Sequence, residues 1–302
     1  MILTYYKGNN FGDAMNPMIF NHLLPGFFDD DPAEHFLGIG SILGFEKGDR
    51  ETKKLIVFSS GFAYDQPPVI DDRYDIRCVR GPMTASVLKL DKSKAVTDGA
   101  VLLRHLPEFQ SDTEKKYKYS YVPHHESELI FDRWEPFFDY LDIHFISPAN
   151  DPMKIVNDIR QSECVYAESL HAAIVADAFR VPWIPVNMFW HINSFKWQDW
   201  MLSMEMEDYK PYNLPRIYNM RWIRLIIQDK LGLSRNNYLN KITSQLYRAY
   251  QTHLYEKKFV EIMKNIAGKE PLLSKDAVIK RKSDQLLEIL EGVKKDYEKI
   301  RS

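Results

Sequence analysis

The sequence predicts an α/β protein built on parallel sheets and followed by a helical extension. Up to about residue 215, short apolar runs rich in Val, Ile, Phe and Tyr alternate with amphipathic or polar stretches of helix length. This alternation is typical of parallel sheets with helices on both faces. From Pro215 onward, apolar residues repeat instead at three- and four-residue steps, which is the period of an amphipathic helix.

The predicted strands are Ile2–Tyr6, Phe36–Ile39, Leu55–Ser59, Ile76–Val79, Ala95–Thr97, Tyr117–Val122, Ile143–Ile146, Cys164–Tyr166 and Trp183–Val186. The predicted helices between them are Asn16–Leu24, Gly81–Leu88, Ser127–Leu141, Asp151–Arg160 and Ser169–Phe179. A polar linker near Leu106–Lys118 interrupts the alternation. We therefore expect two Rossmann-like domains, residues 1–110 and 115–214, which face a cleft, and a basic helical extension over 215–302. Ligands of such sheets bind beyond the carboxyl ends of the strands.

Composition limits the class of protein. Of the 302 residues, 45% are hydrophobic and 27% are charged, as in ordinary soluble globular proteins. The 40 Lys and Arg residues nearly balance the 42 Asp and Glu residues, which excludes a basic nucleic-acid-binding surface over the whole protein. Residues 211–302 alone hold 19 basic and 10 acidic residues, so an acidic body carries a basic tail.

Cysteine usage and the apolar runs indicate a cytoplasmic protein. Cys78 and Cys164 each lie in an apolar run, which favours reduced, buried thiols over a disulfide or a metal site. The first residues form a short apolar strand without a basic leader or a small-residue cleavage site. No run approaches the roughly 18 apolar residues of a membrane-spanning helix.

Small and polar residues follow the first two strands. Gly8 to Asp13 lie between a strand and a helix, where glycine permits close backbone approach and the helix N-terminus attracts a polar or anionic ligand. The alternative is an ordinary turn in which Asp13 or Asn16 caps the helix. Gly40 and Ser41 follow the second strand and leave room for a ligand beside it.

Arg80 and His171 also follow predicted strands. The planar guanidinium of Arg80 suits phosphate or carboxylate binding, and the alternative is a salt bridge with Asp98. His171 lies in the first turn of a helix, where an imidazole donates a proton near neutral pH or serves as a structural histidine. Glu168, Arg80 and the pair His124-His125 all fall at strand ends, and this convergence favours a functional site.

Several catalytic motifs are missing from the sequence. It contains no Gly-x-Ser-x-Gly and no His-Glu-x-x-His motif, and Asp-x-Asp occurs only within the acidic run Asp29-Asp30-Asp31. His124, His125 and Glu126 include metal-binding side chains, but adjacent histidines rarely converge on one ion. The sequence therefore predicts no metal site.

These motifs together resemble the polysaccharide pyruvyl transferase family, in particular its exopolysaccharide and capsule members. The resemblance covers residues 1–200 or so, in the family's order, and leaves out the basic tail. The matching motifs are Asn10-Phe11-Gly12-Asp13 with Asn16-Pro17, Gly38-Ile39-Gly40-Ser41, Arg80-Gly81-Pro82 with Thr84-Ala85, Thr97-Asp98, Pro123-His124-His125, and Glu168-Ser169-Leu170-His171 with Ala176-Asp177 and Val181-Pro182.

The resemblance implies a glycosyltransferase-B-like fold and a transferase without metal or cofactor. The donor would be phosphoenolpyruvate, whose enolpyruvyl unit forms a cyclic ketal on two hydroxyls of one sugar. The resemblance assigns the general acid to His171 and the grip on phosphoenolpyruvate to Arg80. We expect Gly40 and Ser41 to help bind the donor, and Glu168 to deprotonate or orient an acceptor hydroxyl.

One departure from the family changes the donor site. Many members read Ser-x-Arg-x-His, whereas this chain places Ser169 where the second arginine would stand. We expect Ser169 to remain in the donor site and the missing cation to come from Lys196, His124 or His125.

The acceptor side is marked by aromatic residues beside polar groups after the last predicted strand: Trp190-His191, Phe195-Lys196-Trp197 and Trp200. This composition suits stacking on a sugar ring, and it equally suits a buried core. We expect Asn10, Asp13 and Trp197 to bind the acceptor.

The family's acceptors are repeat-unit sugars, often carried on a polyprenyl diphosphate at the inner face of the membrane. Residues 216–258 hold nine Lys or Arg and two Asp or Glu among aromatic and aliphatic residues, which fits an interfacial helix at anionic lipid. The alternative is a helical cap with a solvated basic face. The expected partners are phosphoenolpyruvate and a glycan, without nucleic acid.

Two other functions stay open at this stage. A nucleotide-sugar-dependent glycosyltransferase shares the expected architecture, and a fold does not fix a function. A non-catalytic glycan-binding protein is favoured only by Ser169 in place of the arginine.

Overall fold

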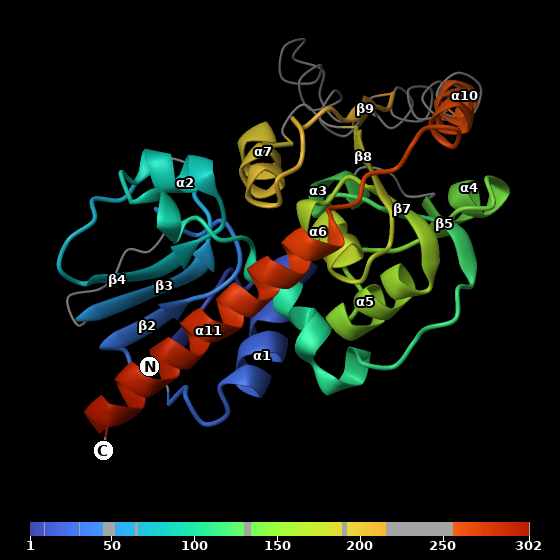
Figure 1. The fold of residues 1–302 in the computed structure, drawn as a ribbon. Helices are drawn as coiled ribbons and strands as arrows, with labels where there is room; N and C mark the ends of the chain where they lie inside the picture. Colours follow the sequence, from blue (N-terminus) through green and yellow to red (C-terminus); the bar gives the residue numbers. More distant parts are fainter. Residues whose placement is uncertain are drawn as a thin grey trace, which may run out of the picture.

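A computed structural model describes residues 1–8, 10–29, 31–44, 52–63, 66–129, 134–188, 192–215 and 256–301. It is an α/β structure with two parallel sheets surrounded by helices, as predicted (Figure 1). Most of the basic segment 216–258, as well as Trp190 and His191, lies outside the described residues.

The first sheet has four parallel strands in sequence order. They are β1 (Ile2–Thr4), β2 (Glu34–Leu37), β3 (Lys54–Ser60) and β4 (Tyr74–Val79). Since all four run in the same direction, the loops that follow them lie along one edge of the sheet.

The second sheet has the strand order β6-β5-β7-β8-β9, again parallel. Its strands are β5 (Tyr117–Val122), β6 (His144–Phe145), β7 (Ser162–Ala167), β8 (Trp183–Asn187) and β9 (Tyr212–Asn213). The chain leaves β5 toward β6 on one side and continues through β7 on the other. Such a reversal is a topological switch point, and ligand sites of doubly wound sheets lie beside it.

The helices with their bounds are α1 (Phe11–Leu23), α2 (Pro82–Val87), α3 (His125–Glu128), α4 (Trp134–Tyr140), α5 (Pro152–Arg160), α6 (Leu170–Ala178), α7 (Ser194–Ser203), α10 (Glu256–Ile266) and α11 (Asp276–Arg301). Three 3-10 helices cover Lys92–Lys94, Gly99–His105 and Pro107–Phe109. Among the described residues, no helix combines the length and apolar character needed to cross a bilayer.

The two sheets share an apolar core at their junction. All nine residues of α6 are buried, and the small side chains of Ala172, Ala173 and Ala176 allow close packing. One continuous cluster of buried side chains joins residues of both halves, including Phe20, Leu102, Ile174, Trp200 and Leu286.

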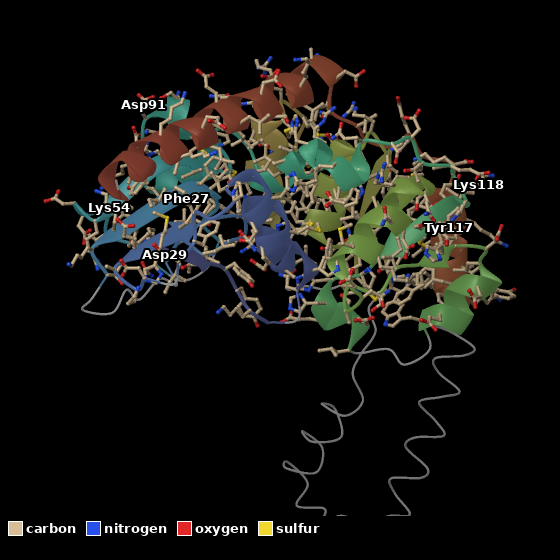
Figure 2. The ribbon with its side chains drawn as sticks, turned by 90° about the horizontal axis from the view of Figure 1, so that it is seen from below. Phe27, Asp29, Lys54, Asp91, Tyr117 and Lys118 are labelled. Atoms are coloured by element: carbon tan, nitrogen blue, oxygen red, sulfur yellow. The ribbon has the colours of Figure 1, made fainter. Side chains whose placement is uncertain are left out.

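Helix α11 extends from the second half of the molecule across to the first sheet (Figure 1), where it contacts β4. Its apolar face buries Leu286, Leu290 and Val293. Near its C-terminal end, Tyr297 donates a hydrogen bond of 2.8 Å to Asp75 and packs against Phe27, which Figure 2 labels, with ring centroids 6.4 Å apart. Within the extension over 215–302, for which the sequence predicts helical structure, α11 is thus observed as a helix.

Several predicted elements were wrong in type or extent. Ala95–Thr97 is not a strand, because only one isolated bridge, Val79 to Ala95, forms before the chain turns into a 3-10 helix. The single helix expected over Ser127–Leu141 comprises two short ones, α3 and α4, with residues 130–133 outside the described part. Helix α7 and strand β9 were not predicted.

Helix α1 begins at Phe11 rather than at the predicted Asn16. Asn10 is its N-cap and accepts a hydrogen bond from the backbone N–H of Gly12. Pro17, inside the helix, cannot donate to the carbonyl of Asp13, and the Asn16 side-chain amide donates to that carbonyl instead, at 2.8 Å. The Asn16 side chain therefore allows Pro17 to lie inside α1 rather than at its start.

Candidate active site

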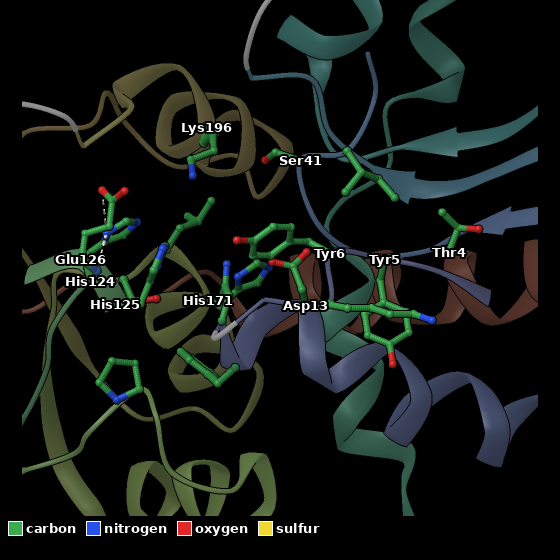
Figure 3. Close-up of a pocket in the computed structure, with 17 residues that line it drawn as sticks. Thr4, Tyr5, Tyr6, Asp13, Ser41, His124, His125, Glu126, His171 and Lys196 are labelled. Carbon is green, nitrogen blue, oxygen red and sulfur yellow. Dashed lines mark hydrogen bonds and ion pairs between the residues drawn. The ribbon is translucent and has the colours of Figure 1, made fainter. Parts of the chain in front are cut away.

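A cavity of about 770 Å³ lies where the loops after β1, β2, β5 and β7 meet, at the switch point of the second sheet (Figure 3). It is lined by Thr4, Tyr5, Tyr6, Lys7, Asn10, Phe11, Asp13, Ser41, Ile42, His124, His125, Glu126, Pro148, Ser169, Leu170, His171 and Lys196. Eight of the residues expected from the sequence are brought together in this lining: Asn10, Asp13, Ser41, His124, His125, Ser169, His171 and Lys196. Gly40, Arg80, Glu168 and Trp197 are absent from it.

His171 lies in the first turn of α6, nearly buried, with an edge-to-face contact to Phe11. Its Nε2 atom is 4.0 Å from Oδ2 of Asp98. Burial lowers the pKa of His171 to about 3, and the nearby charges of Lys196 and Arg80 act in the same direction. The imidazole is therefore uncharged at neutral pH.

Gly12 makes room for His171. A Cβ atom at Gly12 would come within 1.8 Å of Nδ1 of His171, so no other residue fits at this position without displacing the imidazole. Gly12 thus allows the start of α1 to lie close to His171 of α6.

Asp13 places a carboxyl group in the cavity from the first turn of α1. Burial raises its pKa to about 7, Asp98 adds to this rise, and Lys196 opposes it. Gly40 has a positive φ of 120°, and a Cβ atom there would lie 2.3 Å from Oδ1 of Asp13. Gly40 therefore acts on the cavity by admitting the Asp13 carboxyl, which carries a proton in a large fraction of molecules at neutral pH.

Asp98 is a polar group of this cluster whose place the sequence did not predict. It caps the 3-10 helix Gly99–His105, and its Oδ1 accepts a hydrogen bond from the backbone of Ala100 at 3.0 Å. Its Oδ2 is buried and directed to His171. Burial raises the pKa of Asp98 to about 6, and Arg80 opposes that rise. Its place in the Thr97-Asp98 motif was the available signal.

Arg80 is fully buried and reaches the cavity through Ser41. Its Nη1 donates to the Ser41 hydroxyl at 2.7 Å, and its Nη2 donates to the carbonyl of Phe62 at 3.2 Å. Its ion-pair partner is Asp199 of α7, at 3.2 Å, rather than Asp98. Asp199 also accepts hydrogen bonds of 2.6 to 2.9 Å from Thr84 and the backbone of Met83. This network joins α7 to the loops after β2 and β4.

Glu168 is buried beside the cavity and connects three loops. It accepts hydrogen bonds of 3.0 Å from the backbone N–H groups of His124 and Met188, and a longer one from the Tyr121 hydroxyl. Burial raises the pKa of Glu168, which these hydrogen bonds oppose. The carboxylate therefore holds the His124 loop in place.

The opposite wall carries hydroxyl, imidazole and ammonium groups. Ser169 is the N-cap of α6, and its side chain makes no capping hydrogen bond. The rings of His124 and His125 lie 4.3 Å apart, and Lys196 enters from the first turn of α7 (Figure 3). Within the part of the chain described, no three His, Cys, Asp or Glu side chains are grouped to hold a metal ion.

The tryptophans expected to contact a sugar belong to the core. Trp197 and Trp200 are buried, and Trp197 stacks on Tyr209 with ring centroids 4.8 Å apart. The aromatic residues of the lining are instead Tyr5 and Tyr6, which follow β1 directly, and Phe11 at the start of α1, and none of them was predicted as a site residue. Tyr6 differs most from the tryptophans, because it is 56% exposed, and sequence composition does not report exposure.

Sequence comparisons place the chain in a family. The chain belongs to the polysaccharide pyruvyl transferase family, and residues 49–188 match the family described as "Polysaccharide pyruvyl transferase". The chain is also 34% identical over 308 residues to the "Succinoglycan biosynthesis protein ExoV" of Rhizobium meliloti (strain 1021), a match that covers 95% of this chain and 96% of that protein. No solved structure matches the chain significantly.

Proposed function

We propose that this transferase moves the enolpyruvyl unit of phosphoenolpyruvate onto two hydroxyls of one sugar in a polysaccharide precursor, forming a cyclic pyruvate ketal without a metal. One observation carries the proposal: a single cavity brings His171 and Asp13 together with Lys196, Ser169 and His124. These groups are an acid, a hydroxyl-orienting carboxyl and donors for an anionic substrate, which this reaction needs.

The donor would bind the wall formed by Ser41, Ser169, Lys196 and the His124-His125 pair. A phosphate and a carboxylate both accept hydrogen bonds from hydroxyl, ammonium and imidazole groups. The N-terminus of α6, at Ser169, adds a partial positive charge on the same wall. Lys196 and the two histidines thereby replace the arginine that the family places at position 169, and Arg80 acts indirectly by orienting the Ser41 hydroxyl.

The chemistry balances with the groups at hand. His171 donates a proton to the methylene carbon of phosphoenolpyruvate, which leaves an oxocarbenium-like carbon that the first sugar hydroxyl attacks. The bond from this carbon to phosphate breaks, and the second hydroxyl closes the ketal. The two hydroxyl protons replace the proton used on the methyl group and the one that leaves with phosphate.

The low pKa of His171 fits an acid that is charged only when donor is bound. Before binding, burial and the cations Lys196 and Arg80 keep the imidazole neutral. A donor that carries several negative charges offsets these cations and favours the imidazolium form. Proton donation is then coupled to the presence of the donor, and His171 stays unprotonated while the site is empty.

Asp13 and Asn10 would orient the acceptor hydroxyls, since both line the cavity from the start of α1. For Glu168, which holds the His124 backbone, we propose a positioning role. Trp197, as a core residue, would support the wall from behind.

The name of the relative indicates an exopolysaccharide acceptor, and we extend this to the present chain. We further propose that the two sheets mark two domains, 1–110 and 115–214, of glycosyltransferase-B-like arrangement. A lipid-linked acceptor and a peripheral position on the inner face of the plasma membrane, contacted through residues 216–258, complete the proposal. In liposome flotation, we expect binding that depends on anionic lipid.

The decisive experiment incubates the protein with phosphoenolpyruvate and a panel of synthetic and lipid-linked glycosides. We expect phosphate release and a mass increase of the glycan that corresponds to a pyruvate ketal, both unaffected by a chelator. His171→Ala should abolish them, whereas His22→Ala, at an exposed site near the end of α1, should not. Thermal stabilisation by a nucleotide sugar, with none by phosphoenolpyruvate, would overturn the donor assignment.

A further inference from the structure

One aromatic side chain of the cavity is exposed rather than packed. The exposed large apolar side chains of the described residues are Tyr6, Val69, Leu129, Tyr140, Leu202 and Leu273. Tyr6, at 56% exposure, is the member of this set that lines the cavity. An aromatic face that is open to solvent inside a polar cavity is suited to bind an apolar surface of a ligand.

The ring of Tyr6 lies close to the backbone of Gly8. It follows β1 and points into the cavity beside Asp13 and His171, with its hydroxyl directed to the side where His124, His125 and Lys196 lie (Figure 3). Gly8 passes close to the edge of the ring, since a Cβ atom at Gly8 would come within 2.2 to 2.3 Å of the ring and its hydroxyl. A residue larger than glycine would push the ring away.

We propose that Tyr6 is the stacking platform for the sugar ring that receives the pyruvyl unit, an assignment that rests on the proposed function. A pyranose presents an apolar face of C–H groups and an edge of hydroxyls. The face suits the electron-rich surface of an aromatic ring, and the edge then meets the polar groups around it. Stacked on Tyr6, the sugar directs its hydroxyls to Asp13 and to the reacting carbon beside His171.

Tyr5 also lines the cavity but is less exposed than Tyr6, and four further aromatic side chains of this region offer no such surface. Phe11 is 2% exposed and is used in its contact with His171. Trp197 and Trp200 are buried in the core. Phe195 is half-buried, makes an edge contact with Phe62 and does not line the cavity.

The placement divides the cavity between the two substrates. Cationic and hydroxyl groups gather on the wall of His124, Ser169 and Lys196, which suits the anionic donor. Tyr6 borders the remaining space toward β1. Removing the Tyr6 ring should therefore weaken acceptor binding and leave donor binding unchanged.

The test compares Tyr6→Ala and Tyr6→Phe with the wild type. Tyr140→Ala is the matched control, since Tyr140 is also exposed, at 79%, but lies on α4 outside the cavity. Saturation-transfer NMR with a panel of methyl α- and β-hexopyranosides measures sugar binding without turnover. Steady-state kinetics with the best glycoside acceptor and phosphoenolpyruvate gives the KM of each substrate.

We expect the wild type, Tyr6→Phe and Tyr140→Ala to transfer saturation to the C–H protons of at least one glycoside, and Tyr6→Ala to lose the signal. The KM for the acceptor should rise about tenfold in Tyr6→Ala, with the KM for phosphoenolpyruvate within twofold of the wild type. Gly8→Ala, which keeps the ring but displaces it, should shift the acceptor KM in the same direction.

Three outcomes would contradict the proposed stacking role of Tyr6. They are a wild type that binds no glycoside, a saturation-transfer signal from Tyr6→Ala equal to that of the wild type, and a rise in the KM for phosphoenolpyruvate alone. Failure of the proposed function gives a different result. In that case the wild type releases no phosphate from phosphoenolpyruvate with any glycoside, while the NMR comparison of Tyr6→Ala with the wild type still decides the stacking site.

Discussion

Oδ2 of Asp98 lies 4.0 Å from Nε2 of His171, and each of these buried atoms is without a hydrogen-bond partner among the described residues. The two side chains come from opposite halves of the chain, from the 3-10 helix after β4 and from α6. A carboxylate beside an imidazole favours the charged form of the imidazole. Asp98 is therefore in position to support proton donation by His171 once the donor is bound.

Asp98→Asn should lower kcat about tenfold at neutral pH and leave the KM for phosphoenolpyruvate nearly unchanged. Loss of the negative charge lowers the pKa of the donor-bound His171, so the fall in kcat with rising pH should begin at a lower pH. The pH profile of kcat checks this. Asp91→Asn is the control, since Asp91 caps the 3-10 helix Lys92–Lys94 far from the cavity and is exposed (Figure 2). An unshifted profile in Asp98→Asn would contradict the role.

Asp13→Asn should lose activity and gain stability. Burial raises the pKa of Asp13 to about 7 in the folded protein, from 3.8 for a free side chain. Between these values the folded state holds a proton that the unfolded state has released, so the stability that Asp13 contributes falls as pH rises from about 4 to about 7.

Asparagine removes this penalty, and we expect up to about 4 kcal/mol of added stability at pH 8 and almost none at pH 4. Urea unfolding at the two pH values measures the difference. Asp139→Asn, at an exposed site on α4, should change neither stability nor activity. Equal stabilisation of Asp13→Asn at both pH values would argue against a protonated Asp13.

Gly12→Ala should lower kcat by about a hundredfold, because its Cβ would lie 1.8 Å from Nδ1 of His171 and force the imidazole out of place. Gly292→Ala is the matched control. Gly292 lies inside α11 with open space where a Cβ atom would lie, so alanine there should raise stability by about 0.5–1 kcal/mol without affecting kcat. Full activity of Gly12→Ala would show that the position of His171 does not limit the reaction.

Asp199→Ala should destabilise the protein by about 3–5 kcal/mol, since it leaves the buried guanidinium of Arg80 without its counter-ion. Asp296 is 55% exposed and pairs with Arg77 at the surface. Asp296→Ala should therefore lower the free energy of unfolding by at most about 1 kcal/mol. Urea unfolding with comparable slopes measures both values. Asp199→Asn keeps the hydrogen-bond acceptor and should fall between them, and a cost of Asp199→Ala no larger than that of Asp296→Ala would contradict the assignment.

The sequence predicted the two parallel sheets because alternation of short apolar runs and helix-length segments is a local property of the chain. It also predicted which loops face the site, because every loop after a parallel strand lies at the same edge. Ser41, His124, Ser169 and His171 entered the prediction in this way and line one cavity.

What the sequence did not predict depends on pairs of residues that are distant along the chain. Arg80 and Asp199 are 119 residues apart and belong to different halves, so no local pattern identified Asp199 as its partner. The same limit applies to Tyr6 and Trp197. Both are aromatic residues beside polar ones, and only the packing of α7 and β1 decides that the tryptophan is buried and the tyrosine is open.

Helix α11 has a consequence for how the chain reaches its folded state during synthesis. Its start contacts the second half, where Arg180 pairs with Asp276 at 2.7 Å, and its end contacts the first sheet, where Arg77 pairs with Asp296 at 2.6 Å. It follows every other described element in the sequence. The first sheet therefore emerges from the ribosome with the apolar surface beside β4 uncovered. This surface stays exposed until nearly the whole chain has been translated and α11 can pack against it.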